Sequence, residues 1–167
     1  MQIMFCHRRG LAAKAIEVAT WSDFCHTALV YDGVAIEATF KHGVRGVPAE
    51  ALAKSYDKVY IVDIPTGNDE GIFLAALSQV GKPYDVTALL GILAHRDWQE
   101  PDRWFCSELV AWAFSQGGHP LFREQVVHRI TPQMLWMLAY PATQNLDVLV
   151  NSRELVHTQE GAVNAGL

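Results

Sequence analysis

Short apolar runs, separated by Gly, Pro, Asn and Asp, divide the chain into segments with two different periods. Helical spacing predicts helices over residues 10–21 and 106–116, and from Pro132 to about Ala139. A further helix begins after the N-cap Asn68 and is closed by Gly81. The remaining apolar runs are typical of strands and cover residues 2–6, 26–32, 34–39, 58–65 and 146–150. Early strands followed mostly by helices predict an α+β fold, with an antiparallel sheet packed against helices.

The Asp32-Gly33 pair between two apolar runs predicts a tight β-hairpin. With a two-residue turn, Ala28 lies opposite Glu37, and the numbers of paired residues sum to 65. Side chains alternate along a strand, so His26 and Glu37 share one face as diagonal neighbours, about 7–8 Å apart. A three-residue loop would shift the parity and remove this relation.

A carboxylate beside an imidazole fixes the tautomer of the ring and stabilises its protonated form. His26 and Glu37 could therefore be the base and the orienting group of a catalytic triad. A structural interpretation stays open, because His26 could be a surface histidine at the end of a strand. Glu37 could then point to solvent beside Thr39.

Cys106 stands where the loop "PDRWF" becomes the apolar helix "SELVAWAF". The N-terminus of a helix presents unpaired N–H groups and partial positive charge, which favour a thiolate and can hold an oxyanion. Cys106 is therefore the candidate nucleophile, although an ordinary buried cysteine is the alternative. Cys6 is predicted to fill the core, and Cys25 is predicted to face away from His26.

Composition excludes several classes of protein. The chain has 167 residues, half of them hydrophobic, which suits one domain over 1–167 with a frayed tail from about residue 159. A net charge of -5 and the lack of a basic stripe argue against a nucleic-acid partner. Three cysteines without a CxxC pair, and histidines without metal-ligand spacing, predict neither a disulfide framework nor a metal or other cofactor. The other histidines, expected to be superficial or structural, are His7, His42, His95, His119, His128 and His157.

The N-terminal residues lack the order of charged and apolar positions that a secretory signal has, because Arg8 and Arg9 follow the apolar stretch. No apolar run is long enough for a transmembrane segment. We therefore expect a cytoplasmic protein as encoded. A cell-wall target would require delivery by a non-classical route.

Four stretches resemble a known family when taken in order: "TWSDFCHTALVYDGVAIEA", "GVRGVP", "VGKPYD" and "FCSELVAWA". They are similar to the circularly permuted, YiiX-like branch of the NlpC-type cysteine peptidases, which have a papain-like fold. That branch has the histidine first, then the glutamate, then the cysteine, and this chain has the order His26, Glu37, Cys106.

The resemblance implies a Cys106 nucleophile, a His26 general base and acid, and an orienting Glu37. It also implies that Tyr84 shapes the substrate pocket, and Ser107 in the first turn after the nucleophile is expected to contact substrate with it. The implied reaction is hydrolysis of an amide or peptide, including cell-wall peptides of peptidoglycan, through a thioester acyl-enzyme.

Two other functions stay open. Lecithin retinol acyltransferase-like enzymes share the fold group, and residues 86–94 could line an acyl channel, although their helical spacing favours a core helix. A catalytically silent binding module is the third hypothesis. Residues 95–104, before the nucleophile, could act as a lid, and the sequence leaves the oligomeric state open.

Overall fold

The computed structural model describes residues 1–85, 103–123, 126–127, 130–139 and 146–150. Six strands within these residues form one antiparallel sheet in the order β4-β3-β2-β1-β5-β6. The strands are β1 (Gln2–His7), β2 (His26–Tyr31), β3 (Val34–Thr39), β4 (Gly43–Pro48), β5 (Lys58–Asp63) and β6 (Leu146–Val150). The helices are α1 (Leu11–Thr20), α2 (Ala49–Ala53), α3 (Asp69–Leu77), α5 (Cys106–Gln116) and α6 (Pro132–Ala139). The predicted α+β fold is confirmed.

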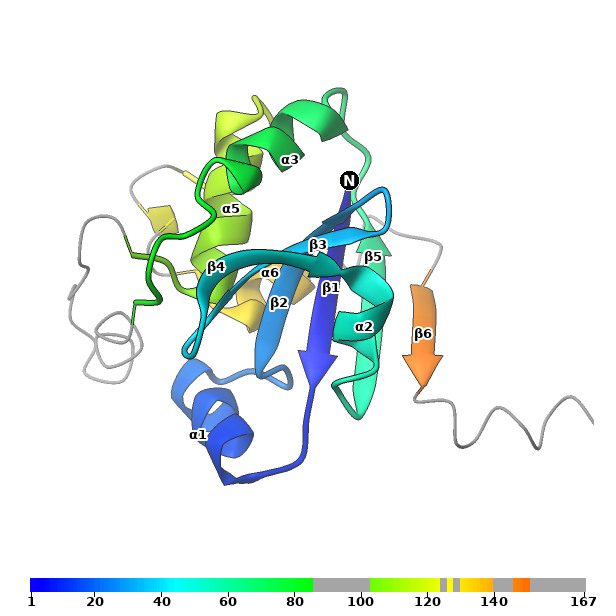
Figure 1. Cartoon of the computed structure of the whole chain (residues 1–167), viewed down its shortest axis with the longest axis vertical. Coiled ribbons are helices and arrows are strands. Elements are labelled where there is room, and N and C mark those ends of the chain that lie inside the picture. The colour runs from blue at the N-terminus through cyan, green and yellow to red at the C-terminus, as the bar shows by residue number, and fades with distance from the viewer. Residues whose placement is uncertain (86–102, 124–125, 128–129, 140–145, 151–167) are drawn as a thin grey trace, which may run out of the picture.

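Helices cover both faces of the sheet (Figure 1). Alternate residues of β1 divide between two apolar clusters, with Ile3 and Phe5 on one face and Met4 and Cys6 on the other. The first face packs against α3, α5 and α6, and the second against α2. The larger cluster holds the sheet and α5 together, and α5 carries the candidate nucleophile.

The β2–β3 hairpin has the turn that the sequence predicts. Asp32 and Gly33 have φ values of 46° and 74°, as a two-residue type I′ turn requires. The pairs that close the hairpin, Tyr31–Val34, Val30–Ala35 and Leu29–Ile36, each sum to 65, so the predicted register is confirmed.

The hairpin ladder nevertheless ends one pair earlier than predicted, at Leu29–Ile36, and Ala28 does not pair with Glu37. Beyond this point β2 continues only against β1, down to His26, and β3 only against β4. Helix α5 packs against both β2 and β3. The two strands are thus no longer paired with each other where the candidate triad lies.

Two predicted helix boundaries differ in outcome. The Asn68 side chain accepts a hydrogen bond from the Gly71 N–H at 3.1 Å, so this N-cap is confirmed. The helix ends at Leu77 instead of continuing to Gly81. Gly81 instead donates its N–H to the Val44 carbonyl at 2.9 Å, which ties this segment to β4.

The sequence did not predict β4 or α2. Residues 43–48 contain two glycines and a proline, which weaken a strand signal. A close backbone approach requires one of these glycines, because a Cβ on Gly43 would lie 2.3 Å from the Lys82 carbonyl oxygen. Helix α2 spans only five residues, too few for a periodic pattern. Among the described residues, no helix is long and apolar enough to cross a bilayer.

Candidate active site

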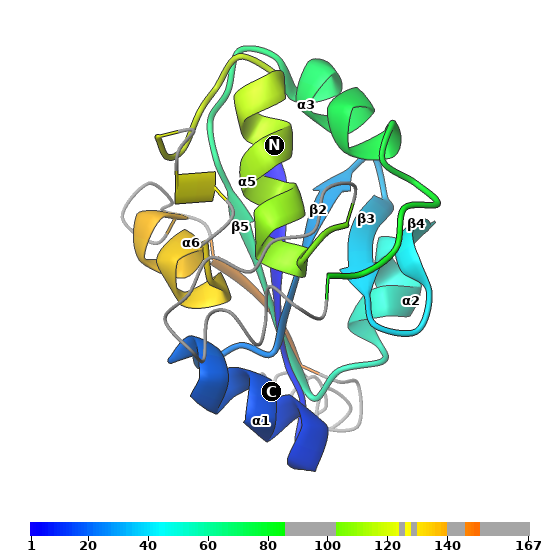
Figure 2. The ribbon, with the colours of Figure 1, turned by 90° about the vertical axis from the view of Figure 1, so that its left-hand side faces the viewer.

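Cys106 is the first residue of α5, which packs against β2 and β3 (Figure 2). Phe105 has extended backbone angles, and its N–H donates to the Glu108 carboxylate at 3.2 Å. The Leu109 N–H to Phe105 carbonyl bond, at 3.0 Å, is the first within the helix. The N–H groups of Cys106 and Ser107 therefore have no acceptor inside the helix, which makes this end suited to an anion.

His26 and Glu37 lie in contact, on the shared face that the hairpin register predicts. The Nε2 atom of His26 is 2.7 Å from Oε2 of Glu37, and both side chains are buried. The other carboxylate oxygen, Oε1, accepts from Arg45 Nε at 2.8 Å and lies 2.7 Å from Arg45 Nη2. Arg45 is directly opposite Glu37 in the β3–β4 ladder. The carboxylate is thus shared between an imidazole and a guanidinium.

Arg45 and His26 together hold Glu37 in its ionised form. Burial alone would raise the pKa of the Glu37 carboxyl, since it disfavours charge. Hydrogen bonds and the positive charges of His26 and Arg45 outweigh burial and lower this pKa below its ordinary value. Glu37 is therefore a carboxylate at neutral pH.

Cys106 acts on the same imidazole, because it is among the groups that raise the pKa of His26. Since Nε2 of the ring faces Glu37, Nδ1 is the nitrogen left for Cys106. Burial is the largest effect on the His26 pKa and would lower it. The hydrogen bonds and negative charges of Cys106 and Glu37 outweigh burial and raise this pKa from 6.5 to about 9. An imidazolium at neutral pH is the partner that stabilises a thiolate.

Tyr84 borders the nucleophile, as the sequence led us to expect. Its ring packs against the cluster of Phe105 and Cys106, with 5.8 Å between the ring centres of Tyr84 and Phe105. Ile16 of α1 packs against the same cluster. Burial, followed by the nearby charge of Cys106, raises the pKa of the Tyr84 hydroxyl, so it stays protonated. Tyr84, Phe105 and Ile16 therefore form an apolar and aromatic part of the surroundings of Cys106.

A family model described as "Permuted papain-like amidase enzyme, YaeF/YiiX, C92 family" matches residues 3–160. The chain belongs to this family. The resemblance to YiiX-like permuted papain enzymes is therefore confirmed, and with it the class of the protein, a cysteine hydrolase of the amidase and peptidase type. A comparison with curated proteins found no match.

One solved structure has a fold similar to that of this chain. It is the crystal structure of the metalloprotein YiiX from Escherichia coli O157:H7, 20% identical, with a TM-score of 0.57. The match covers 89% of this chain and 94% of YiiX. The part of this chain that the structure describes contains no group of three or more His, Cys, Asp or Glu that could hold a metal ion.

Ser107 lies next to the nucleophile, but its side chain points into the protein. The residue is completely buried, and its hydroxyl donates to the main-chain carbonyl of Ile130. This bond ties the first turn of α5 to the segment that leads into α6. The predicted contact of Ser107 with substrate stays a prediction, and any such contact would fall to its N–H group.

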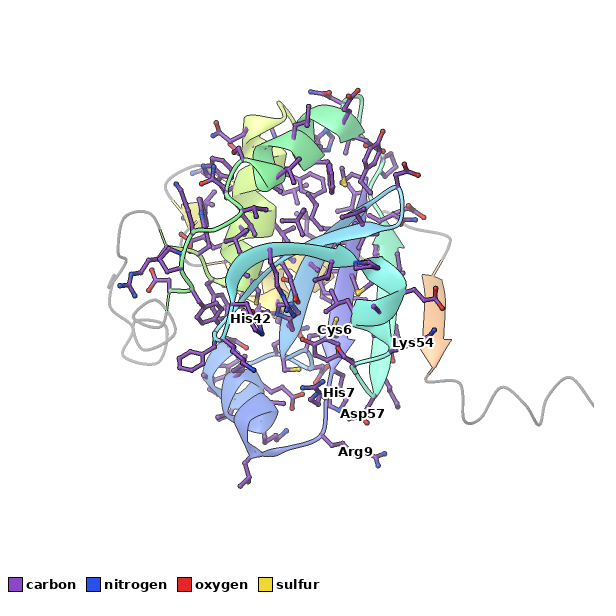
Figure 3. The ribbon with its side chains drawn as sticks, viewed as in Figure 1. Cys6, His7, Arg9, His42, Lys54 and Asp57 are labelled. Carbon is purple, nitrogen blue, oxygen red and sulfur yellow. The ribbon has the colours of Figure 1, made fainter. Side chains whose placement is uncertain are left out.

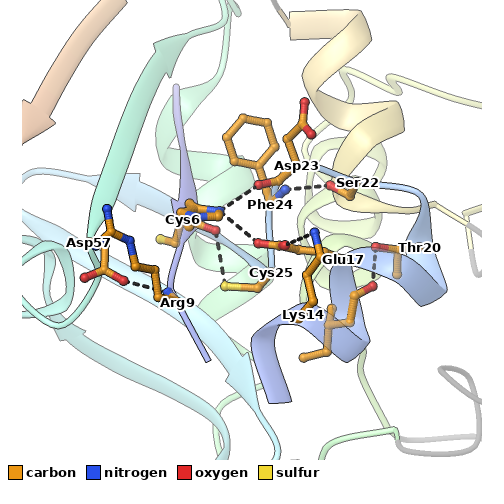
Figure 4. Close-up of polar contacts among 12 residues, drawn as sticks. Cys6, Arg9, Lys14, Glu17, Thr20, Ser22, Asp23, Phe24, Cys25 and Asp57 are labelled. Atoms are coloured by element: carbon orange, nitrogen blue, oxygen red, sulfur yellow. Dashed lines mark hydrogen bonds and ion pairs between the residues drawn. The ribbon is translucent and has the colours of Figure 1, made fainter. Parts of the chain in front are cut away.

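The other two cysteines have unreactive surroundings. The Cys25 thiol donates to the Cys6 main-chain carbonyl at 3.4 Å (Figure 4). Burial raises the pKa of Cys25 to about 11 and that of Cys6 well above its ordinary value. Both thiols are therefore protonated at neutral pH.

Several predictions concern other histidines and loops. His7 lies 2.8 Å from the buried carboxylate of Glu17, and His42 is exposed in the β3–β4 turn (Figure 3). Trp104, at the end of the predicted lid, is buried and donates from Nε1 to Gln79 at 3.2 Å. The remaining predictions fall outside the described residues, and they concern residues 86–94, 95–102 and 159–167, and His95, His128 and His157.

Sequence reasoning missed two residues that contact the candidate triad, Arg45 and Tyr56. Arg45 could have been found, because extending the hairpin to a third strand would place the one charged residue of "GVRGVP" near Glu37. Tyr56 lies between α2 and β5, and its ring is stacked on His26. No local pattern connects Tyr56 to residue 26.

Proposed function

We propose that this member of the C92 family hydrolyses an amide bond through a triad of Cys106, His26 and Glu37. The observation that carries the proposal is the buried contact of His26 with Glu37, together with the effect of Cys106 on the pKa of the same imidazole. The His26 and Glu37 side chains are buried, and the Glu37 carboxylate also contacts the Arg45 guanidinium. A nucleophile, a base and a group that orients the base are the parts that acyl transfer requires.

The thiolate of Cys106 attacks the carbonyl carbon of the scissile amide and forms a tetrahedral intermediate. Its oxyanion accepts hydrogen bonds from N–H groups of the first turn of α5, which have no acceptor within the helix. His26 then gives its Nδ1 proton to the leaving amine, and the carbon–nitrogen bond breaks. A thioester on Cys106 remains.

Hydrolysis of the thioester reverses the proton transfers. Neutral His26 takes a proton from water at Nδ1, and the resulting hydroxide attacks the thioester carbonyl. The carbon–sulfur bond breaks, a carboxylic acid leaves, and the thiolate–imidazolium pair is restored. Throughout the cycle, Glu37 accepts a hydrogen bond from the Nε2–H group and keeps the ring in one orientation.

Cell-wall peptides are the substrate class that we propose. The resemblance of the motifs to NlpC-type peptidases supports this choice, and it makes soluble peptidoglycan fragments the first substrates for testing. The apolar and aromatic groups around Cys106, Tyr84 and Phe105 among them, suit a substrate with an uncharged segment beside the scissile bond.

The test is a search for the acyl-enzyme. The protein is incubated with peptidoglycan fragments and with simple acyl amides, quenched in acid and digested, and the peptide that contains Cys106 is weighed. We expect an added acyl mass on that peptide and release of a free amine. Cys25→Ala should retain both signals, and Cys106→Ala should lose both. Amine release that persists in Cys106→Ala would contradict the proposal.

A further inference from the structure

A tyrosine outside the proposed triad lies against its histidine. The Tyr56 ring is nearly parallel to the His26 imidazole, with 7° between the planes and 5.8 Å between the centres. Tyr56 follows α2, and it packs against the apolar cluster that α2 forms with β1, β2 and β3. This distance and angle are those of an offset stack of aromatic rings.

The connection between β1 and α1 holds Tyr56 in place. The guanidinium carbon of Arg8 lies over the Tyr56 ring, 4.9 Å from its centre. Arg8 Nε also donates to the Ser55 carbonyl at 3.1 Å, on one side of the tyrosine. On its other side, Asp57 accepts from the Arg9 N–H at 2.6 Å, as the neighbouring positions of Arg9 and Asp57 in Figures 3 and 4 show.

Ser55 and Asp57, the residues on either side of Tyr56, are thus both tied to the segment after β1. Asp57 also donates its N–H to the carbonyl of His7, the last residue of β1, at 3.0 Å. The loop that carries Tyr56 is therefore attached to the same strand that pairs with β2 at Cys6 and His26. A ring held in this way restricts rotation of the imidazole that it covers.

The ring is also electrostatically suited to a charged imidazole. Burial is the main cause that raises the pKa of the Tyr56 hydroxyl, and the negative charge of Glu37 adds to it, so the ring is neutral. The face of a neutral aromatic ring carries partial negative charge and attracts cations. Stacking on Tyr56 therefore favours the imidazolium form of His26 over the neutral form.

We propose that Tyr56, held by Arg8, is a positioning residue that aligns His26 between Cys106 and Glu37 and favours its protonated form. The inference rests on the proposed function, because it assigns a role within the same thiolate–imidazolium pair. Tyr56 does not touch substrate in this account. Its effect is therefore on the rate and on its pH dependence, and not on the KM.

The experiment follows alkylation of Cys106 by iodoacetamide between pH 5.5 and 10, read by peptide mass. Tyr56→Leu removes the ring, Tyr56→Phe keeps it, and Arg8→Gln removes only the guanidinium. Tyr31→Leu is a matched control, since it removes a tyrosine that packs on Phe73 near the opposite end of β2. NMR titration of the His26 ring in each variant reports its protonation directly.

We expect Tyr56→Leu to slow alkylation at pH 6.5 by about three- to tenfold and to shift the His26 titration to lower pH. Tyr56→Phe should restore most of the loss, Arg8→Gln should show a smaller loss, and Tyr31→Leu should show none. The KM for an amide substrate should stay within about twofold of wild type.

This design distinguishes failure of the proposed function from failure of the role of Tyr56. If wild-type Cys106 shows no reactivity that depends on His26, the proposed function fails. If that dependence is present, but a folded Tyr56→Leu protein keeps the wild-type profile, only the role of Tyr56 is overturned. Should Tyr56→Leu fail to fold, an unchanged profile and His26 titration in Arg8→Gln would overturn the role of the pair.

Discussion

The two ends of the β2–β3 hairpin differ in pairing and in chemistry. At the turn, three residue pairs close a ladder of mostly buried apolar side chains around Asp32-Gly33. At the open end, β2 and β3 pair with other strands instead of each other, and His26 and Glu37 lie there in contact. The turn end fixes the register of the two strands, and this register places His26 and Glu37 on the same face at the open end.

This difference shows how a short-range signal can position a long-range site. The turn determines which residues of β2 and β3 share a face, and therefore that the imidazole and the carboxylate meet. The nucleophile comes from α5, much later in the chain, at the place where the hairpin ladder has ended. Changes at the open end should therefore alter catalysis, and changes at the turn should alter stability alone.

The largest expected effect comes from the residue that α5 brings to the open end. Cys106→Ala should lower the kcat for amide hydrolysis by about 10⁴-fold or more, because no acyl-enzyme can form. The midpoint of thermal unfolding should stay close to wild type. Cys25→Ala is the matched control, and it should retain the wild-type kcat. An equal loss in both variants would contradict the assignment of the nucleophile.

The next largest effect should follow from Glu37→Gln. This change keeps the shape but removes the negative charge of Glu37, which helps to raise the pKa of His26. We expect the kcat to fall by about 10²-fold. In wild type, activity should decline as the pH rises through about 9, where His26 loses the proton that the leaving amine needs. In Glu37→Gln this decline should begin at lower pH, and an unmoved alkaline limb would argue against the pairing.

Arg45→Met should also lower activity, but less than Glu37→Gln does. Without the guanidinium, the pKa of Glu37 rises toward its ordinary value, and its negative charge is less well balanced. We expect activity to drop by about three- to tenfold, and the acid limb of the pH profile to move upward. Arg45→Lys retains a charge without the two-atom contact, so it should lie between Arg45→Met and wild type. A steady-state pH profile of all three proteins measures this order.

The smallest effect on activity is expected at the turn. Gly33→Ala puts a side chain at a φ of 74°, which should cost about 1 kcal/mol in the free energy of unfolding. Gly67→Ala is the control, because Gly67 has no positive φ and no neighbour within 4 Å of an added Cβ. Urea unfolding measures both free energies. Activity per folded molecule should stay within about twofold of wild type in each variant, and a larger loss in Gly33→Ala would break the separation of the two ends.

The sequence was sufficient where local chemistry decides the structure. The Asp32-Gly33 turn predicted both its register and the contact of His26 with Glu37, and Asn68 marked the start of α3. These features depend on a few consecutive residues with a specific backbone requirement. The cysteine at the head of α5 was found for the same reason, since the loop and the helix meet at that residue.

Contacts between distant segments were not predictable in this way. Strand β4 holds two glycines and a proline, so its pairing depends on β3 and on the Gly81–Lys82 segment. Arg45 was missed with that strand. Tyr56 reaches His26 only because the Arg8 region and the loop after α2 hold each other. The early end of the β2–β3 ladder likewise depends on the neighbouring strands β1 and β4 and on α5.

The most direct test of the account is the pH dependence of alkylation at each cysteine, in wild type and in His26→Ala. We predict that Cys106 alone reacts with iodoacetamide at about pH 6.5 and loses most of this reactivity in His26→Ala. Cys6 and Cys25 should stay unreactive in both proteins, because burial raises the pKa of each thiol. A Cys106 that is inert, or equally reactive with and without His26, would contradict the central claim.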